Sequence, residues 1–198
     1  MEIKKVVIPV AGKGTRFLPV TKEVPKELIP IINKPMIQYV VEEAIYSGIE
    51  EVIFVTSPGK EAIEGYFSRN EALENFLIKK KKHKELDMCR KIGAMISFKT
   101  VIQEEQLGLG HAILCAEEFV DNSPFAVLLG DTICTGDPNC TKGLVKIFEK
   151  KQASVFAVEK IKPEETKRYG VVSGNEIESD LMLVDKLVEK PEPEFAPS

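Results

Sequence analysis

The sequence predicts an α/β fold, namely a Rossmann-like three-layer sandwich with a mostly parallel mixed central sheet. Short β-branched apolar runs alternate with longer amphipathic segments along the 198 residues, which is the order expected of strands and helices in such a sheet. The apolar runs lack polar alternation, as strands covered on both faces do. The 43% hydrophobic and 29% charged residues are the balance of an ordinary globular domain, and one domain is predicted over residues 1–198.

The first strand is predicted at Ile3–Val10, a run rich in valine and isoleucine. The loop over Ala11–Asn33 is long for a compact domain, and Pro19, Pro25 and Pro30 fix the backbone φ angle along it. Long ordered loops that follow a strand are usually functional. We therefore look for a binding site in this loop.

A helix is predicted at Met36–Ser47, because its apolar residues recur at i, i+3, i+4 and i+7. Pro35 suits the first helical position and Gly48 suits the stop. Val52–Val55 is predicted to form the second strand.

A helical insertion is predicted at about residues 59–92, as one helix at Gly59–Ser68 and a second at Glu71–Arg90. The second helix carries the basic run Lys79–Lys84. This run has no interleaved aromatic residues and is surrounded by glutamates, so it indicates a solvated helix face rather than a nucleic-acid site.

The remaining elements continue the alternation of strands and helices. Strands are predicted at Met95–Ile102 and Pro124–Leu129, and helices at about His111–Glu118 and at Lys142–Lys150. Three further strands are predicted, of which the last two are expected to complete the sheet: Ala153–Val158, Tyr169–Val172 and Leu183–Val188.

The net charge of −4 gives no general attraction to nucleic acids or anionic membranes. No apolar run is long enough to cross a bilayer, and the N-terminus lacks the features of a signal peptide. The four cysteines are scattered without a C-x-x-C pair, and the two histidines complete no zinc spacing. We therefore expect a cytoplasmic protein with free thiols and with no nucleic-acid or membrane partner.

A glycine-rich turn follows the first predicted strand directly. Glycines there let backbone N–H groups come close to an anion, because no Cβ stands in the way. It is not a P-loop, because Lys13 is followed by Gly14, and it is not a dinucleotide fingerprint, because Phe17 holds the third glycine position. The turn predicts a phosphate site, and Phe17 argues against a nicotinamide-dependent dehydrogenase.

A carboxylate stands at the end of the predicted strand Pro124–Leu129, in the pair Gly130-Asp131. Ligands of open α/β sheets bind at the carboxyl ends of the strands. Mg²⁺ prefers one or two carboxylates together with phosphate oxygens. Asp131 is therefore predicted to bind Mg²⁺ beside the phosphate loop.

Three motifs follow one another in the first quarter of the chain. They are G-x-G-T-R-x-L-P from Gly12, P-K-E-L-x-P from Pro25, and K-P-x-I-Q-Y-V-V-E-E-A from Lys34. In this order they resemble the bacterial UTP–glucose-1-phosphate uridylyltransferases, and the likeness runs over essentially the whole chain. The resemblance implies a fold of the nucleotide-diphospho-sugar transferase type.

The resemblance also implies a function, which is Mg²⁺-dependent transfer of UMP from UTP to glucose-1-phosphate, giving UDP-glucose and pyrophosphate. The family's proteins are longer, so the chain is expected to be C-terminally incomplete and to lack a second metal-binding carboxylate. A homo-oligomer is expected for the full-length protein, and turnover by this chain alone is expected to be weakened or absent, with nucleotide binding retained.

Residue roles carry over from the family by motif. The catalytic residues implied are Arg16, Lys26 and Asp131. The nucleotide-binding residues implied are Ala11, Gly12, Lys13, Gly14, Thr15, Glu27, Gln103 and Gly108, and those for the sugar phosphate are Gly170, Glu189 and Lys190.

Three of the nucleotide-binding residues, Glu27, Gln103 and Gly108, match family positions that face the uracil ring. The matching Gln103 can donate to a base carbonyl and accept from the ring N–H, and Gly108 lets the base lie against the backbone. His111 is interpreted as a structural residue that opens the next helix.

Two alternatives remain open. A thymidylyltransferase that uses dTTP resembles this chain, but its loop reads S-K-Q-L-L-P where this chain has Pro25–Pro30, and it usually lacks the helical insertion. A non-catalytic nucleotide-binding or sugar-binding relative would have lost catalytic residues, whereas Arg16, Lys26, Asp131 and Lys190 are intact.

Overall fold

The computed structural model describes residues 2–198. Contacts along the chain divide it into two compact units, the first ending at Val155 and the second spanning Phe156–Ser198. The sequence predicted one domain, and the structure shows a boundary close to the end of the last large helix.

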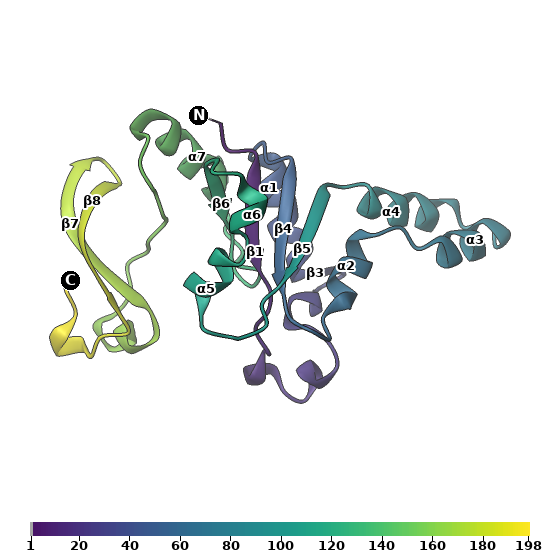
Figure 1. The fold of residues 1–198 in the computed structure, drawn as a ribbon, viewed down its shortest axis with the longest axis horizontal. Helices are drawn as coiled ribbons and strands as arrows, with labels where there is room; N and C mark the ends of the chain where they lie inside the picture. The colour runs from purple at the N-terminus through teal and green to yellow at the C-terminus, as the bar shows by residue number, and fades with distance from the viewer. Residues whose placement is uncertain (1) are drawn as a thin grey trace. The chain divides into compact units, whose positions relative to one another are not determined.

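The first unit is built on a parallel sheet. Within residues 2–198 this sheet has four strands in the order β5-β4-β1-β6 (Figure 1). The strands are β1 (Lys5–Pro9), β4 (Glu51–Thr56), β5 (Ser97–Ile102) and β6 (Phe125–Val127). Every pairing in the sheet is parallel, which confirms the predicted fold class. Antiparallel pairing occurs outside it, in β2 (Pro30–Ile31) with β3 (Lys34–Pro35) and in the second unit.

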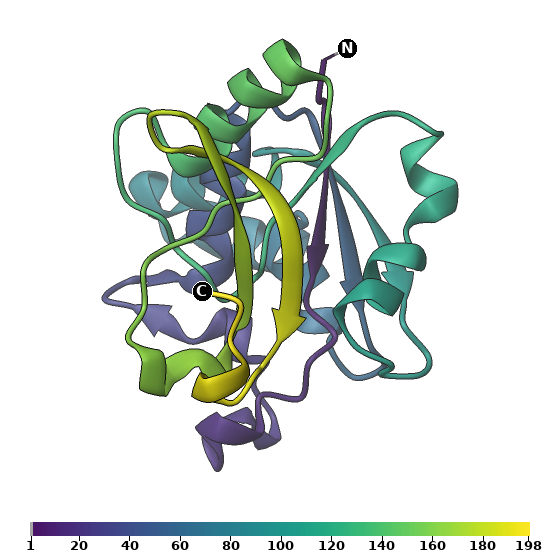
Figure 2. The same cartoon turned by 90° about the vertical axis from the view of Figure 1, so that its left-hand side faces the viewer.

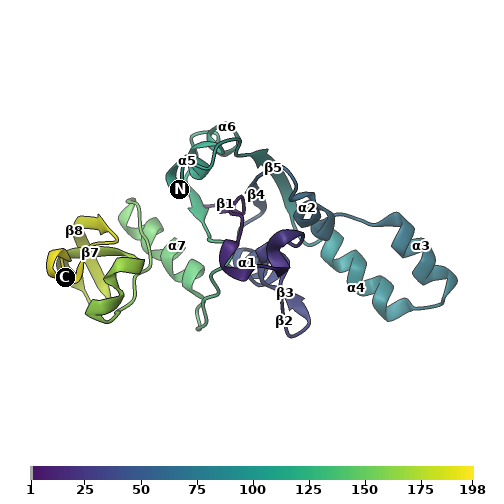
Figure 3. The same ribbon diagram turned by 90° about the horizontal axis from the view of Figure 1, so that it is seen from below.

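Helices cover both faces of the sheet and make three layers (Figure 3). On one face, Val6 and Ile8 pack with α1 (Met36–Tyr46) and α2 (Glu61–Phe67). On the other, Val7 packs with α5 (Leu109–Leu114) and α6 (Glu117–Val120). Val6, Val7 and Ile8 are 0% exposed, and burying each contributes about 1.5–3 kcal/mol. The central strand β1 is thereby fixed, and so is the start of the loop that follows it.

Helix α1 agrees with its prediction. Its buried side chains include Ile37, Val40, Val41 and Ala44, which are the predicted apolar stripe. The chain leaves the helix through Gly48, whose φ of 89° is readily adopted only by glycine.

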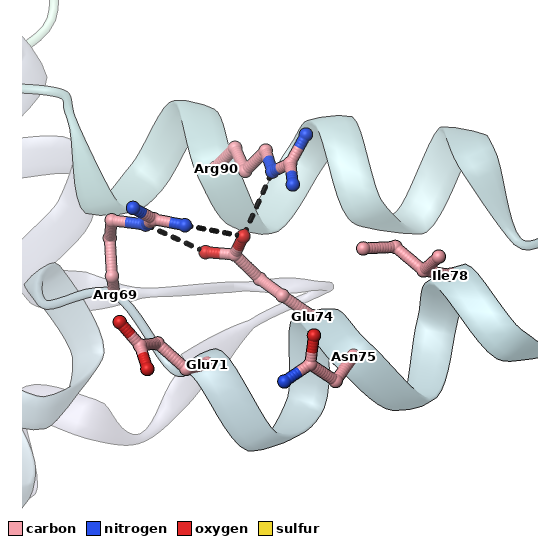
Figure 4. Close-up of a pocket in the computed structure, with 6 residues that line it drawn as sticks. All are labelled: Arg69, Glu71, Glu74, Asn75, Ile78 and Arg90. Atoms are coloured by element: carbon pink, nitrogen blue, oxygen red, sulfur yellow. Dashed lines mark hydrogen bonds and ion pairs between the residues drawn. The ribbon is translucent and has the colours of Figure 1, made fainter.

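The helical insertion is a hairpin of two helices, and the prediction of one helix over Glu71–Arg90 was wrong. The structure has α3 (Glu71–Lys79) and α4 (His83–Gly93), with Lys80–Lys82 in the turn between them. The two helices lie side by side (Figures 1 and 4). Each buries one leucine, Leu77 or Leu86, which a single continuous helix would leave in water.

An ion cluster joins the two helices of the hairpin. Glu74 on α3 accepts hydrogen bonds from Arg69, at 2.8 and 2.9 Å, and from Arg90 on α4, at 2.9 Å (Figure 4). These two guanidinium groups lower the pKa of Glu74 from 4.5 to about 2. Glu74 therefore holds the hairpin in its ionised form.

We expect this cluster to make the stability of the hairpin depend on pH. The folded-state pKa of Glu74 is below its unfolded value, so its contribution is complete above about pH 4.5 and is lost as the pH falls toward about 2. Urea unfolding of wild type and of Glu74→Gln, from pH 7 to pH 2, measures the contribution of the Glu74 carboxylate to the unfolding free energy at each pH. The difference in unfolding free energy should be largest at pH 7 and shrink below pH 4.5, and a constant difference would contradict the assignment.

The helices around β6 differ in detail from their predictions. The single helix predicted at His111–Glu118 is divided into α5 and α6. The helix predicted at Lys142–Lys150 is α7 (Cys140–Lys151), and Asn139 caps it by accepting a hydrogen bond from the Lys142 N–H.

The second unit holds an antiparallel hairpin of its own, seen in Figure 2 as a twisted two-stranded ribbon. Its strands are β7 (Gly170–Glu178) and β8 (Leu181–Glu189). The prediction that these strands complete the central sheet was wrong, because they pair with each other across a tight turn in which Asp180 has a φ of 60°. The strand predicted at Ala153–Val158 was also wrong, since that exposed segment pairs with no strand among the described residues.

None of the helices in residues 2–198 combines the length and the apolar character that crossing a membrane requires.

Candidate active site

The first unit brings two loops together at the carboxyl edge of the sheet. β1 and β6 are parallel neighbours, so the segments that follow them leave from the same edge. The glycine turn follows β1, and Gly130-Asp131 follows β6. Gly130 packs closely there, because a Cβ on it would lie 2.8 Å from Val10 Cγ1.

Lys26 joins these two loops. It begins a short 3₁₀ helix, η3 (Lys26–Leu28), and its Nζ lies 2.5 Å from Asp131 Oδ2. A Cβ built on Gly12 would be 3.8 Å from the same Nζ. The structure therefore brings together three predicted residues that are far apart in sequence.

The glycine turn is held in a conformation that depends on Gly14. Its φ of 64° is left-handed, and a Cβ there would lie 3.0 Å from Lys26 Cβ and 3.1 Å from Thr21 Cγ2. The Thr21 hydroxyl donates to the Gly14 carbonyl oxygen at 2.8 Å. A side chain at position 14 would thus disturb both the turn and the base of Lys26.

Two basic side chains of the turn carry no ion pair. Lys13 and Arg16 are exposed, and neither is paired with a carboxylate anywhere in residues 2–198. Arg16 lies with Thr15 in a second 3₁₀ helix, η1 (Thr15–Phe17). These charges are available to an anion at the edge of the sheet.

Lys60 is the residue of this site that sequence reasoning missed. It precedes α2, and its Nζ donates to Val10 O at 2.5 Å, Gly12 O at 2.6 Å and Glu27 Oε2 at 2.9 Å. Burial lowers the pKa of Lys60, and the charge of Glu27 opposes that shift. One buried ammonium group thus ties the end of β1, the glycine turn and the Lys26–Leu28 segment to one another.

Glu27 is placed beneath the turn rather than on its surface. The side chain is 1% exposed and bound to Lys60. Its predicted contact with the nucleotide base stays a prediction, whereas its contact with Lys60 shows that it positions the loop.

A cleft of ≈ 390 Å³ opens beside the glycine turn, which is within the size range of ligand sites. It is lined by Lys13, Ser57, Pro58, Gln103, Glu104 and Gln106. Two of these residues, Ser57 and Gln106, donate to the Ala11 carbonyl oxygen at 3.1 and 3.0 Å. They hold the start of the turn against the cleft, and the sequence did not single out these contacts.

Gln103 lies at the end of β5, where its N–H continues the ladder to Thr56 O at 2.7 Å. Its side-chain Nε2 is 3.3 Å from Gly108 O and 3.0 Å from His111 Nδ1. The predicted pair Gln103 and Gly108 is therefore in contact, and Gly108 has the φ of 101° that suits a glycine at the start of α5.

The predicted sugar-phosphate residues form a group in the second unit. Gly170 pairs with Glu189 across the β7–β8 ladder, and a Cβ on Gly170 would lie 3.3 Å from Glu189 Oε2. Lys190 Nζ is 2.9 Å from Glu189 Oε1. The structure brings these three residues together with one another, and their role stays a prediction.

Asp131 is a single carboxylate rather than part of a metal cluster. In the described part of the chain, no group of three or more His, Cys, Asp or Glu side chains could hold an ion. A Mg²⁺ ion held by one carboxylate and by substrate phosphates fits this arrangement.

The family model for nucleotidyl transferases matches residues 5–197. The chain belongs to the nucleotidyl transferase family. The match covers both compact units, so the nucleotidyltransferase assignment applies to the whole described chain. The resemblance predicted from the sequence motifs is confirmed.

Curated relatives and solved structures agree with this assignment. UTP–glucose-1-phosphate uridylyltransferase 1 of Staphylococcus saprophyticus is 47% identical over 198 residues, which are 100% of this chain and 69% of that protein. A UTP–glucose-1-phosphate uridylyltransferase of Pseudomonas aeruginosa is 43% identical, over 99% of this chain and 71% of that protein.

Among solved structures, a UDP-glucose pyrophosphorylase complexed with UDP-glucose matches at 41% identity and a TM-score of 0.87, over 99% of this chain and 72% of that one. The UTP-bound enzyme from Acinetobacter baumannii matches at 40% identity and a TM-score of 0.89, over 99% of this chain and 70% of that one. The chain thus spans about 70% of the length of these proteins.

Proposed function

We propose that the chain transfers the uridylyl group of UTP to glucose-1-phosphate in a Mg²⁺-dependent reaction that yields UDP-glucose and pyrophosphate. The observation that carries the proposal is the meeting of Lys26, Asp131 and the Gly12–Gly14 turn at one edge of the sheet, where ligands of α/β folds bind. The substrate assignment is supported by the names of the relatives and by the UTP and UDP-glucose complexes among the similar structures.

The reaction forms a bond between a phosphate oxygen of glucose-1-phosphate and the α-phosphorus of UTP. The bond from that phosphorus to the pyrophosphate oxygen breaks. Two anions must approach for this, and like unit charges near 4 Å repel by about 4 kcal/mol at an effective dielectric of about 20. Positive charge at the site has to offset several such pairs.

The first unit supplies that charge in two ways. Lys13 and Arg16 would bind the triphosphate together with the backbone N–H groups of the glycine turn. Lys26 would stabilise the charge that develops on the reacting phosphates. No covalent protein intermediate is needed, so catalysis would consist of positioning and charge stabilisation. In the second unit, Glu189 would accept from sugar hydroxyls and Lys190 would hold the sugar phosphate.

Asp131 is the residue that would hold Mg²⁺, with phosphate oxygens as further ligands. The bound ion would supply neutralising charge on the phosphates. Because Lys26 is now paired with Asp131, metal binding to this carboxylate would leave the Lys26 ammonium to the substrate. The homo-oligomer and the cytoplasmic location expected from the sequence also stay predictions.

Pyrophosphate release tests the proposal, with UTP and dTTP each crossed against glucose-, galactose- and mannose-1-phosphate, and with and without Mg²⁺. We expect the fastest release from UTP with glucose-1-phosphate and Mg²⁺. Equal or faster release with dTTP would favour the thymidylyltransferase. Calorimetric titration with UTP accompanies the assay, because the chain is expected to bind UTP even where its turnover is weak, and an absence of UTP binding would contradict the proposal.

A further inference from the structure

We propose that His111 is a positioning residue which fixes the Gln103 amide as a hydrogen-bond acceptor and thereby favours uracil over cytosine in the nucleotide site. The proposal rests on the proposed function, because it takes UTP as the nucleotide. It goes further by assigning the selection between the two pyrimidines to a residue that does not itself touch the base.

The amide nitrogen of Gln103 lies within hydrogen-bond distance of two groups of the protein, and in the tautomer that the proposal requires, with His111 Nδ1 unprotonated, both groups are acceptors. Gln103 Nε2 lies 3.3 Å from the Gly108 carbonyl oxygen and 3.0 Å from His111 Nδ1. A primary amide carries two N–H donors, and these two partners account for both. Gln103 is only 4% exposed, so these contacts are shielded from competing water.

The two partners oppose rotation of the amide by 180°. Such a rotation would place the amide oxygen against the Gly108 carbonyl oxygen and against the unprotonated Nδ1 of His111. Both contacts would then join two acceptors, and the amide N–H groups would lose their partners. A buried donor left without a partner destabilises that orientation, so His111 and Gly108 together favour the other one.

The Gln103 carbonyl oxygen remains for a ligand. It accepts no hydrogen bond from residues 2–198. Among these residues, the only polar side-chain atom that is both buried and without a hydrogen bond is Thr100 Oγ1. The unpaired Gln103 oxygen is therefore not a buried atom. The Gln103 oxygen is therefore reachable, and the residue lines the cleft beside the glycine turn. Gln103 offers this cleft an acceptor and no free donor.

An acceptor in this place distinguishes the two pyrimidine bases. The ring nitrogen N3 of uracil carries a hydrogen and can donate to the Gln103 oxygen, whereas N3 of cytosine is an acceptor and would face it with repulsion. The sequence predicted that Gln103 both donates to the base and accepts from it. With His111 Nδ1 unprotonated, as proposed, only acceptance is left to the amide, and that is the property by which the amide can reject cytosine.

The test compares the binding of UTP and CTP to the full chain by calorimetric titration, in wild type, His111→Ala and His111→Asn. Removing the acceptor in His111→Ala should lower the ratio of UTP affinity to CTP affinity by about tenfold. The Asn side chain keeps an acceptor oxygen near the position of Nδ1, so His111→Asn should retain most of the ratio. The control is His83→Ala, which changes the other histidine, an exposed residue on α4, and should leave the ratio unchanged.

The outcomes separate this proposal from the proposed function. Equal loss of UTP and CTP binding in His111→Ala would show a merely structural role and overturn the proposal. Failure of wild type to bind UTP would overturn the proposed function instead.

In that case the ¹⁵N chemical shifts of the His111 ring still decide the positioning role. An unprotonated Nδ1 supports the acceptor geometry, and a protonated Nδ1 contradicts it. Because the chain has only two histidines, the His83→Ala spectrum assigns the signals.

Discussion

The Asp131→Asn variant is expected to lose Mg²⁺-dependent uridylyl transfer by about a hundredfold to a thousandfold, the effect of removing one pre-organised charge contact from a reacting group. Asn keeps the shape of the side chain and can still accept from Lys26. It lacks the negative charge that would hold the metal, so the loss comes from the charge and not from a disturbed fold.

The matched control for Asp131→Asn is Asp121→Asn. Asp121 also pairs with a lysine, with its Oδ2 3.2 Å from Lys5 Nζ, but it follows α6 and lies near the amino end of β1. Its φ of 52° is one that Asn adopts readily. Transfer rates should be unchanged in the control, and a near-wild-type rate for Asp131→Asn would show that the metal is held elsewhere.

The Lys60→Met variant is expected to have the largest effect on stability, about 3–5 kcal/mol, because it removes the 2.9 Å partner of the buried Glu27 carboxylate and leaves it only the 4.0 Å ion pair with Lys26. A domain of this kind has about 5–15 kcal/mol in total, so the loss is severe. Two carbonyl oxygens, of Val10 and Gly12, lose their donor as well. We therefore also expect weaker UTP binding, since the glycine turn loses its anchor.

Urea unfolding and UTP titration of three further variants separate these effects. Lys60→Met/Glu27→Gln removes the uncompensated charge and should recover part of the stability, while UTP binding stays weak because the turn is still unanchored. Glu27→Gln alone measures how much the Glu27 carboxylate contributes to the free energy of unfolding and to UTP binding. Lys91→Met changes an exposed lysine on α4 and should alter neither the stability nor the UTP affinity. Normal UTP binding by Lys60→Met would show that Lys60 does not anchor the glycine turn for the nucleotide.

The parts of the fold that depend on local pattern could be predicted from the sequence. β1 is a β-branched run flanked by turn residues, and α1 has an apolar stripe with Pro35 before it and Gly48 after it. In both elements the local preference and the burial agree. The two parallel neighbours β1 and β6 then place the glycine turn and Asp131 at one edge, which is why that much of the site was predictable.

Other elements depend on packing partners that no local pattern reveals. The turn at Lys80–Lys82 has no glycine or proline to signal it, and it is explained by the helix pair that buries Leu77 and Leu86. Ala153–Val158 has the composition of a strand, but it has no neighbouring strand to pair with among the described residues. β7 and β8 were correctly identified as strands, but they pair with each other and not with the central sheet. Each strand finds its partner directly across the tight turn that joins them, which is close in sequence.

Lys60 was missed for a related reason. It follows the buried strand β4 by four residues, so it emerges at the same edge as the glycine turn and Asp131. The signal was present, because a lysine near the end of a parallel strand can reach that edge. The sequence analysis assigned Lys60 to the helical insertion instead, because the residues after it form α2.

The most direct test of the account is a crystal structure of the chain with UTP and Mn²⁺, in which anomalous scattering locates the ion. We predict the triphosphate against the N–H groups of the Gly12–Gly14 turn and the ion at about 2.1 Å from the Asp131 carboxylate, with Lys26 turned from Asp131 toward the phosphates. A nucleotide bound away from this edge, with the Lys26–Asp131 ion pair intact, would contradict the account.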